Sequence, residues 1–327
     1  MLFRKIVKYP IVYIPLDVFF SIFTFFGAAW LRLAKFIGLS KLPVTRKILF
    51  KIGVFPIVDN YYEPLFRFDR LSLKDEPRNL AIDWNDDVQL NLVNQFNVKD
   101  ELDKLPVEPA FQNDLSYYFN NQSYSGYDAE YLYSFIRLMK PKKIIEIGSG
   151  FSTRMIMVAI EKNKQENKET VAEIICVEPF EMPWLEQLGP QIIRKKVEDI
   201  PFSFFQSLEA GDILFIDSSH VIRPEGDVLY EVFNILPHLK PGVYIHIHDI
   251  FSPFDYPKNW YLQEYRMWNE QYLLEAFLMH NKQYEVIGAL SYLGYKYPHL
   301  AQMNFPYSYK NGWKRGSAMW LRKSGLS

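Results

Sequence analysis

Cysteine is almost missing from this chain of 327 residues, and its scarcity excludes a disulfide-stapled fold. Cys176 is the only cysteine, so no pair exists that could form an internal disulfide. A lone thiol fits a reducing compartment, which points to the cytoplasm. An excess of positive charge is missing too, because 37 Lys and Arg face 38 Asp and Glu. We therefore expect no nucleic-acid partner.

Aromatic residues, in contrast, are abundant: they make up 17% of the chain, with 22 Tyr and 26 Phe. Such side chains fill cores and line grooves for planar or sugar-like ligands. Apolar residues account for 49% of the chain, which is enough for a large core. The length suits one large domain with an extension, or two domains.

The longest apolar run lies near the amino terminus, at residues 11–31. It is about as long as a bilayer core requires, roughly 20 residues, although Pro15 and Asp17 interrupt it. More basic residues follow the run than precede it, a bias that would keep the rest of the chain in the cytoplasm. Two interpretations remain open: a helix that enters or lies on a membrane surface, or an apolar helix packed on the protein itself.

From residue 128 onward the pattern changes to alternating strands and helices. Short apolar runs predict strands at 143–147, 173–178, 191–197, 212–217, 242–249, 284–292 and 317–322. Helices are expected at 86–105, 152–161, 228–236 and 264–280, and the charged run 162–169 is expected to be a surface loop. This alternation predicts an α/β fold with a mostly parallel sheet, in which ligands bind beyond the carboxyl ends of the strands.

A glycine turn follows the first of these strands, in the run EIGSGFST. Gly148 and Gly150 let the backbone turn tightly and approach a ligand, and the next helix begins at Ser152 with free N–H groups. A dinucleotide site would have a third glycine where Thr153 stands. An S-adenosylmethionine site needs no pyrophosphate cradle, and Glu146 can supply or orient the contact to its ammonium group. S-adenosylmethionine is therefore the expected cofactor.

Acidic residues also follow the next two strands. Glu178 ends the second strand, where a carboxylate can accept both ribose hydroxyls of a nucleoside. Glu198 follows the third strand, where a polar side chain could meet the adenine amine. The expected cofactor-binding residues are Glu146, Gly148, Ser149, Gly150, Ser152, Thr153, Glu178, Glu198 and Asp217.

The runs KPKKIIEIGSGFST, ICVEP, GDILFIDSSH and LKPGVYIHIHDIF resemble class I S-adenosylmethionine-dependent methyltransferases. They are most similar to a bacterial subgroup known as methyltransferase family 24, over residues 124–322. The resemblance implies a Rossmann-like, seven-stranded sheet with a reversed last hairpin and S-adenosylmethionine as methyl donor. It also implies that Glu146, Gly148 and Gly150 border the methionine part, Glu178 the ribose and Glu198 the adenine.

The class fold does not account for the helical, aromatic amino-terminal extension. We therefore expect three parts: an apolar segment at 1–52, whose association with a membrane stays open, a cap or substrate region at 53–125 and a methyltransferase domain at 126–327.

Histidines and acids gather at the ends of the fourth and fifth strands, in the runs DSSH and HIHD. A methyltransferase must position its acceptor and, for a hydroxyl, remove a proton. His220 or His248 could act as the base, because an imidazole titrates near neutral pH, and Asp217 or Asp249 could orient it. His246 shares a strand face with His248 but lies deeper, so we expect it to be a buried core residue.

The same acids raise the alternative of a divalent metal. Some catechol-type methyltransferases bind magnesium between acids after these two strands, and Asp217 and Asp249 match those positions. The third ligand of that pattern is an Asn directly after the second acid, where Ile250 stands here. We therefore predict no metal, and keep Asp217 and Asp249 as the ligands of a weaker metal hypothesis.

The run FSPFDYPKNWYLQEYRMW after the fifth strand is long for a connection and rich in aromatic residues. We expect it to form a wall over the acceptor, with Tyr256, Trp260 and Trp268 facing it and Tyr124 closing the other side. The predicted function is O-methylation, with N-methylation also open, of a small-molecule or glycan acceptor. Two alternatives are an NAD-dependent oxidoreductase and a non-catalytic, membrane-anchored scaffold of the same fold. The oligomeric state is open.

Overall fold

A computed structural model describes residues 10–59, 63–66, 71, 74–111, 114–121, 123–180, 182–312 and 314–325. Contacts divide the chain into two compact units, Met1–Ser72 and Leu73–Ser327. We call them the amino-terminal unit and the main unit. The sequence predicts a separate region at 53–125, whereas the structure has one boundary, near Ser72. The physical reason is that Leu92 and Tyr117 are buried in the same core cluster as residues of the sheet.

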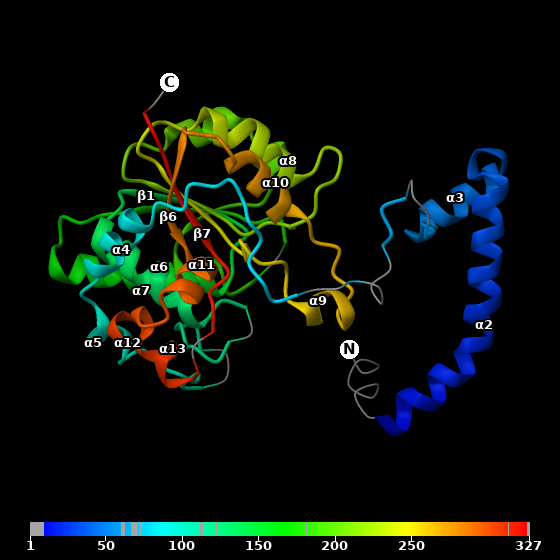
Figure 1. The fold of residues 1–327 in the computed structure, drawn as a ribbon, viewed down its shortest axis with the longest axis horizontal. Helices are drawn as coiled ribbons and strands as arrows, with labels where there is room; N and C mark the ends of the chain where they lie inside the picture. The colour runs from blue at the N-terminus through cyan, green and yellow to red at the C-terminus, as the bar shows by residue number, and fades with distance from the viewer. Residues whose placement is uncertain are drawn as a thin grey trace. The chain divides into compact units, whose positions relative to one another are not determined.

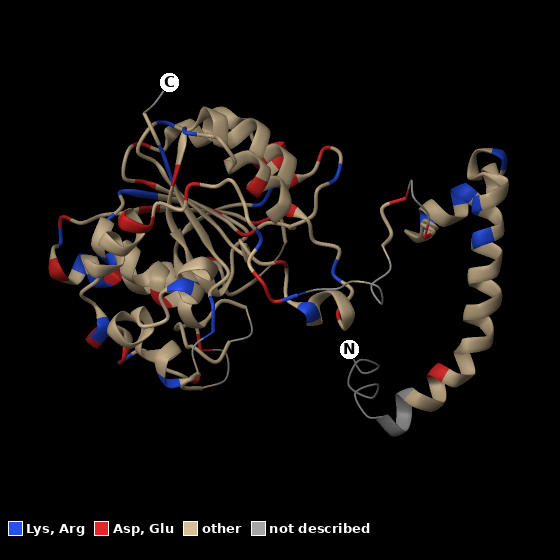
Figure 2. Ribbon diagram, viewed as in Figure 1, with Lys and Arg blue, Asp and Glu red and all other residues tan. Residues whose placement is uncertain are grey.

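The amino-terminal unit is helical, with α2 (Pro10–Ile37), η1 (Leu39–Lys41) and α3 (Pro43–Ile52). Within α2, Ile14–Ile37 is long and apolar enough to cross a membrane, judged by length and composition. Its apolar side chains are exposed, and its carboxyl end is held by an ion pair of 2.7 Å between Lys35 and Glu63. Charged residues are sparse along α2, and basic residues gather near one end (Figure 2).

The main unit contains a seven-stranded sheet in the order β3-β2-β1-β4-β5-β7-β6. The strands are β1 (Lys143–Ile147), β2 (Glu173–Val177), β3 (Gln191–Ile193), β4 (Ile213–Ile216), β5 (Tyr244–Ile247), β6 (Tyr284–Ala289) and β7 (Met319–Lys323). The strands β1 to β5 are parallel, and β7 runs antiparallel to both β5 and β6. The α/β fold class and the reversed last hairpin expected from the resemblance are confirmed.

Helices cover both faces of this sheet (Figure 1). The helices and helical turns are α4 (Asp86–Asn94), α5 (Lys99–Leu102), α6 (Gly126–Met139), α7 (Phe151–Glu166), η3 (Glu186–Leu188), η4 (Val197–Asp199), η5 (Phe202–Ser207), α8 (Asp227–Tyr230), the π-helical turn η6 (Glu231–Ile235), η7 (Leu236–His238), α9 (Lys258–Leu262), α10 (Glu270–Leu278), α11 (Leu290–Lys296), α12 (Leu300–Asn304) and α13 (Pro306–Lys310).

Side chains alternate along each strand and so divide the core into two clusters. Ile144 lies in the cluster that also holds residues of α4, α6, α7 and α11. Ile145 and Ile147 lie in the cluster on the opposite face, with residues of η6 and α10. This double burial explains why the strands are nearly continuous apolar runs in the sequence.

Two predicted helices and one predicted loop differ from the structure. The expected helix 264–280 begins only at Glu270, because the residues before it are irregular and Tyr265 has a left-handed φ of 54°. The expected loop 162–169 is helical as far as Glu166, since its Lys, Gln and Glu residues favour helix. The expected helix 86–105 is split into α4 and α5.

Candidate active site at the ends of β1, β4 and β5

The glycine turn after β1 packs tightly against the end of β4. Gly148 has a φ of +78°, and a Cβ on it would lie 1.9 Å from the main-chain oxygen of Asp217, so only glycine fits. Gly150 differs, because a Cβ there would meet nothing within 4 Å. Position 148 therefore fixes the turn, and position 150 borders open space where a ligand can approach the backbone.

Glu146 holds the start of helix α7 rather than facing open space. Its fully buried carboxylate accepts hydrogen bonds from Ser152 Oγ at 2.7 Å and Thr153 Oγ1 at 2.6 Å. Thr153 in turn accepts a hydrogen bond of 3.0 Å from the N–H of Gly150. Burial raises the pKa of Glu146 to about 7 against the opposing effect of these hydrogen bonds. Of the two roles expected for Glu146, the contacts favour orienting the loop over direct contact with a ligand.

Glu178, directly after β2, accepts one backbone hydrogen bond on each carboxylate oxygen. The donors are the N–H of Ser149 at 3.1 Å and the N–H of Phe180 at 2.9 Å. Each oxygen keeps a second lone pair, so the carboxylate can still accept a pair of ligand hydroxyls. Glu198, the residue expected at the adenine, lines a cavity of about 540 Å³ together with Tyr230.

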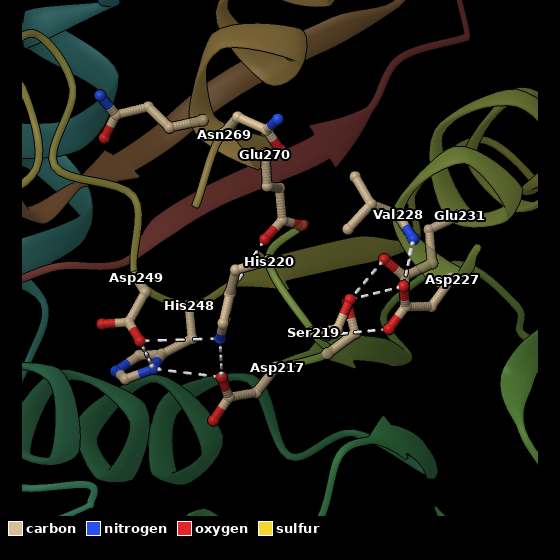
Figure 3. A network of polar contacts seen from close by, with 12 residues as sticks. Asp217, Ser219, His220, Asp227, Val228, Glu231, His248, Asp249, Asn269 and Glu270 are labelled. Atoms are coloured by element: carbon tan, nitrogen blue, oxygen red, sulfur yellow. Dashed lines mark hydrogen bonds and ion pairs between the residues drawn. The ribbon is translucent and has the colours of Figure 1, made fainter. Parts of the chain in front are cut away.

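A buried cluster of acids and imidazoles joins the ends of β4 and β5 (Figure 3). His220 Nε2 lies 3.2 Å from Asp217 and 3.7 Å from Asp249, measured to a carboxylate oxygen of each. His248 Nδ1 lies 3.5 Å from Asp217 and 3.7 Å from Asp249. The four residues proposed from the sequence as catalytic are therefore brought together, and each carboxylate contacts both imidazoles.

A third acid, Glu270, belongs to this cluster and is missed by the sequence analysis. Its Oε2 lies 2.9 Å from His220 Nδ1, and both side chains are buried (Figure 3). The N–H groups of Asn269 and Glu270 also bond to the carbonyl of His220, at 3.0 and 3.3 Å. The start of α10 is thereby tied to the loop after β4. The sequence shows Glu270 only as an acid near a helix start, a common capping pattern.

The backbone is strained at two members of the cluster. His220 has a φ of 61° and Asp249 a φ of 55°, both in the left-handed region that non-glycine residues rarely occupy. Strain of this kind costs on the order of 1 to 3 kcal/mol and persists where surrounding contacts impose it.

Burial and charge pull the pKa values of the cluster in different directions. Burial alone would lower the pKa of His248, but the carboxylates of Asp249 and Asp217 raise it to about 10. The pKa of His220 is likewise raised well above its usual value, because hydrogen bonds to Asp217 and Glu270 outweigh burial. Both sets of contacts favour the charged form of the imidazole.

The two aspartates respond in opposite ways. Burial alone would raise the pKa of Asp217, but the imidazoles of His248 and His220 hold it well below its usual range. Burial raises the pKa of Asp249, and His248 only partly offsets this effect. Asp217 is thus firmly ionised, whereas Asp249 binds a proton more readily.

A cavity of about 960 Å³ opens beside the cluster, with His248 and Asp249 in its lining. Tyr256 and Trp260 also line it. Trp268 instead packs on the imidazole of His220, with ring centroids 4.2 Å apart.

Tyr124, expected to close the other side of the acceptor site, is buried, and its ring centroid lies 4.9 Å from that of His248. Trp268 and Tyr124 therefore support the imidazoles rather than line the cavity. His246 is fully buried and stacks on Phe215 at 4.1 Å, as expected for a core residue.

Residues 145–250 match the model of a protein family described as "Methyltransferase domain". This match confirms the resemblance to a methyltransferase over the segment that holds the glycine turn and most of the polar cluster. The chain is also 31% identical over 139 residues to an uncharacterized protein of Archaeoglobus fulgidus, a match that covers 41% of this chain and 61% of that protein. The chain thus spans about three fifths of the length of this relative.

Two solved O-methyltransferases are also similar to the chain. One is TomG of Streptomyces achromogenes, crystallised with S-adenosylmethionine, at 13% identity and a TM-score of 0.35 over 79% of this chain and 94% of that one. The other is from Bacillus cereus, in complex with S-adenosylhomocysteine, at 13% identity and a TM-score of 0.33 over 78% of this chain and 94% of that one.

Proposed function

We propose that the methyltransferase domain matched over residues 145–250 transfers a methyl group from S-adenosylmethionine to a hydroxyl group of a small-molecule or glycan acceptor. One observation carries this proposal. The main-chain oxygen of Asp217 packs against Gly148 of the glycine turn. The side-chain carboxylate of Asp217 contacts both imidazoles of the cluster. A cofactor bound at the turn and an acceptor bound at the cluster would therefore be neighbours.

The residues around the turn fit the proposed cofactor. The open space at Gly150 admits a ligand close to the backbone, and Glu178 has acceptor capacity left for two ribose hydroxyls. Glu146 holds the turn in shape through Ser152 and Thr153. When bound, S-adenosylmethionine supplies a methyl group on a sulfonium that is already a good leaving group.

Within the cluster, Asp249 is the group that we propose takes the proton of the acceptor hydroxyl. It lines the 960 Å³ cavity, and both imidazoles contact its carboxylate. A bound S-adenosylmethionine would supply the methyl group and keep the carbon–sulfur electron pair on its sulfur, and Asp249 would take the proton that the acceptor oxygen gives up. His220 and His248 then act by holding the carboxylates in place, a different role from the base expected from the sequence.

The donor set of Asp217, His248 and Asp249 also fits a divalent cation, because their ligand atoms lie within 4.8 Å of one another. Such a cation would orient the acceptor oxygen and lower the pKa of its hydroxyl. Ile250, however, stands where the magnesium pattern has its amide ligand. We therefore keep a metal-free site as the proposal.

A binding experiment separates this function from its rivals. Calorimetric titration of the full chain with S-adenosylhomocysteine should show saturable binding, and titration with NAD should show none. Binding of NAD alone would favour an oxidoreductase, and binding of neither would favour a non-catalytic scaffold. Transfer of tritium from S-adenosylmethionine to a panel of hydroxylated and amine acceptors would then distinguish O- from N-methylation.

We also propose that the amino-terminal unit attaches the protein to a membrane surface. Helix α2 exposes large apolar side chains, among them Phe23 and Phe26, which are 64% and 66% exposed. The helix α3 that follows is amphipathic and carries Arg46, Lys47 and Lys51, which can approach anionic lipid headgroups.

A further inference from the structure

The cavity beside the catalytic cluster is large for a simple alcohol. Its volume of about 960 Å³ is near the upper end of the range for sites that enclose drug-sized ligands, about 300 to 1,000 Å³. Its lining includes His248 and Asp249 of the cluster together with residues from several other segments of the main unit. An acceptor that fills it must therefore extend well beyond the hydroxyl that reacts.

One side of the cavity is aromatic. Phe251 and Trp260 pack edge to face at 5.1 Å, and Tyr256 lies 6.3 Å from Trp260. The guanidinium of Arg266 lies over Trp260, 4.1 Å from the ring centroid, which helps to fix that ring in position. Rigid aromatic rings of this kind bind the apolar faces of sugar or other ring systems.

Apart from Asp249 in the cluster, the acids of the lining already have partners. Asp75 pairs with Arg315, which itself lines the cavity, and Asp255 lies 3.5 Å from Arg78. The carboxylate of Asp128 accepts a hydrogen bond of 2.8 Å from the N–H of Ser317. These carboxylates therefore have little capacity left to attract a cationic ligand.

The lysines of the lining are in the opposite situation. Lys74, Lys258 and Lys314 come from segments far apart in the sequence, yet all three line this one cavity. Among the described residues, none of their ammonium groups has a hydrogen-bond or ion-pair partner. Three unpaired positive charges around one opening favour a ligand that carries several negative charges, as a phosphate or diphosphate does.

We propose that the acceptor is a phosphorylated, ring-containing hydroxyl compound, whose phosphate is bound by Lys74, Lys258 and Lys314 while its ring lies on the wall of Tyr256 and Trp260. This inference rests on the proposed function, because the hydroxyl is delivered to Asp249. It narrows the acceptor from any small molecule or glycan to a phosphate ester, soluble or lipid-linked.

Glucose 1-phosphate, inorganic phosphate and glucose serve as probes in a calorimetric titration of the full chain saturated with S-adenosylhomocysteine. Glucose 1-phosphate should bind more tightly than inorganic phosphate, and glucose should bind most weakly. The affinity for glucose 1-phosphate should fall as the salt concentration is raised. Each substitution Lys74→Gln, Lys258→Gln or Lys314→Gln should weaken binding about threefold, and all three together roughly thirtyfold, the range of exposed ion pairs.

The matched control is a triple variant at exposed lysines outside the cavity, Lys104→Gln, Lys168→Gln and Lys195→Gln. It should bind glucose 1-phosphate as the unaltered chain does. Equal losses in both triple variants, or equal binding of glucose and glucose 1-phosphate, would overturn the inference while leaving the methyltransferase proposal intact. Loss of S-adenosylhomocysteine binding in the unaltered chain would instead overturn the proposed function. If lipid vesicles that contain a polyprenyl phosphate compete with glucose 1-phosphate, the natural source of the phosphate is a lipid.

Discussion

His220 Nδ1 and Glu270 Oε2 lie 2.9 Å apart in the buried interior, so the orientation of the imidazole is set by an acid 50 residues further along the chain. With Nδ1 engaged in this way, Nε2 is turned toward Asp217 and Asp249. Glu270 is thus a positioning residue, acting on the cluster through the histidine.

The substitution Glu270→Gln should release this orientation. An amide places a weaker acceptor, or an N–H group, opposite Nδ1, and we expect methyl transfer to fall by about tenfold or more with S-adenosylhomocysteine affinity unchanged. Proton NMR gives a readout that needs no acceptor: the hydrogen-bonded Nδ1 proton of His220 should give a downfield resonance that Glu270→Gln shifts or removes. Glu285→Gln, which breaks an ion pair with Arg322, is the control and should leave the resonance in place.

The two glycines of the turn should respond to substitution in opposite ways. Gly150→Leu places a side chain in open space, so the fold should survive while binding of S-adenosylhomocysteine is lost. Gly148→Ala brings a methyl group against the oxygen of Asp217 and should lower the melting temperature. Thermal unfolding followed by circular dichroism, together with calorimetric titration, measures both effects. A Gly150→Leu variant that keeps full affinity would mean that the cofactor binds elsewhere.

The parts of this site that the sequence predicts are those fixed by local pattern. Strands buried on both faces are continuous apolar runs, so β1, β4 and β5 are recognisable, and the residues that follow them lie at one edge of a parallel sheet. Asp217 and His248 are found in this way. Glu270 is not, because its contact with His220 comes from tertiary packing between segments that no periodicity links.

The aromatic wall shows a second limit of sequence reasoning. The run after β5 is rich in aromatic residues, but the sequence does not tell which rings face the cavity. Tyr256 and Trp260 line it, whereas Trp268 packs on His220. That outcome is set by the tertiary contact between Trp268 and His220, which no local pattern predicts.

Stability should depend on pH through Glu130, a fully buried acid on α6. Its carboxylate accepts hydrogen bonds from the N–H groups of Tyr307 and Ser308 at 2.8 and 3.0 Å, and burial still raises its pKa to about 7. The folded state therefore holds this proton more tightly than the unfolded chain, whose pKa is near 4.5. The stabilisation is complete below about pH 4.5 and is lost as pH rises through 7.

Between pH 4.5 and 7, Glu130 alone should lower the free energy of unfolding by on the order of 3 kcal/mol. Glu130→Gln should remove this decrease, so the difference in unfolding free energy between this variant and the unaltered chain should change with pH, as urea titrations at several pH values would show. Glu161→Gln on the exposed face of α7 is the control, with a difference that should stay flat. A flat difference for Glu130→Gln as well would mean that its pKa is ordinary.

Metal titration distinguishes a metal-free catalytic cluster from one that binds a divalent cation. Because Ile250 stands where the magnesium pattern has its amide ligand, calorimetric titration with Mn²⁺ should show no saturable site, and prior treatment with EDTA should leave methyl transfer unchanged. Saturable binding that disappears in Asp217→Asn but persists in Asp75→Asn would contradict the metal-free proposal. Asp75 is the suitable control because it lines the cavity away from the cluster.

Membrane attachment should depend on the exposed aromatic residues of α2. Burying one Phe side chain in lipid is worth roughly 1.5 to 3 kcal/mol, so Phe23→Ser with Phe26→Ser should weaken partition into vesicles of phosphatidylcholine and phosphatidylglycerol about a hundredfold or more. Both residues are well exposed, so the substitutions should leave the melting temperature of the main unit unchanged. Flotation of the full chain on a density gradient measures the partition.

The matched control for this experiment replaces two exposed phenylalanines of the main unit, Phe111→Ser and Phe180→Ser, which are 66% and 73% exposed. If general stickiness of exposed aromatic side chains caused flotation, both double variants would lose it equally. If α2 is the attachment, only Phe23→Ser with Phe26→Ser loses it, and raising the salt concentration should weaken the remaining contribution of Arg46, Lys47 and Lys51. A full chain that stays at the bottom of the gradient at every salt concentration would rule out membrane attachment, and the apolar face of α2 would then require a protein partner.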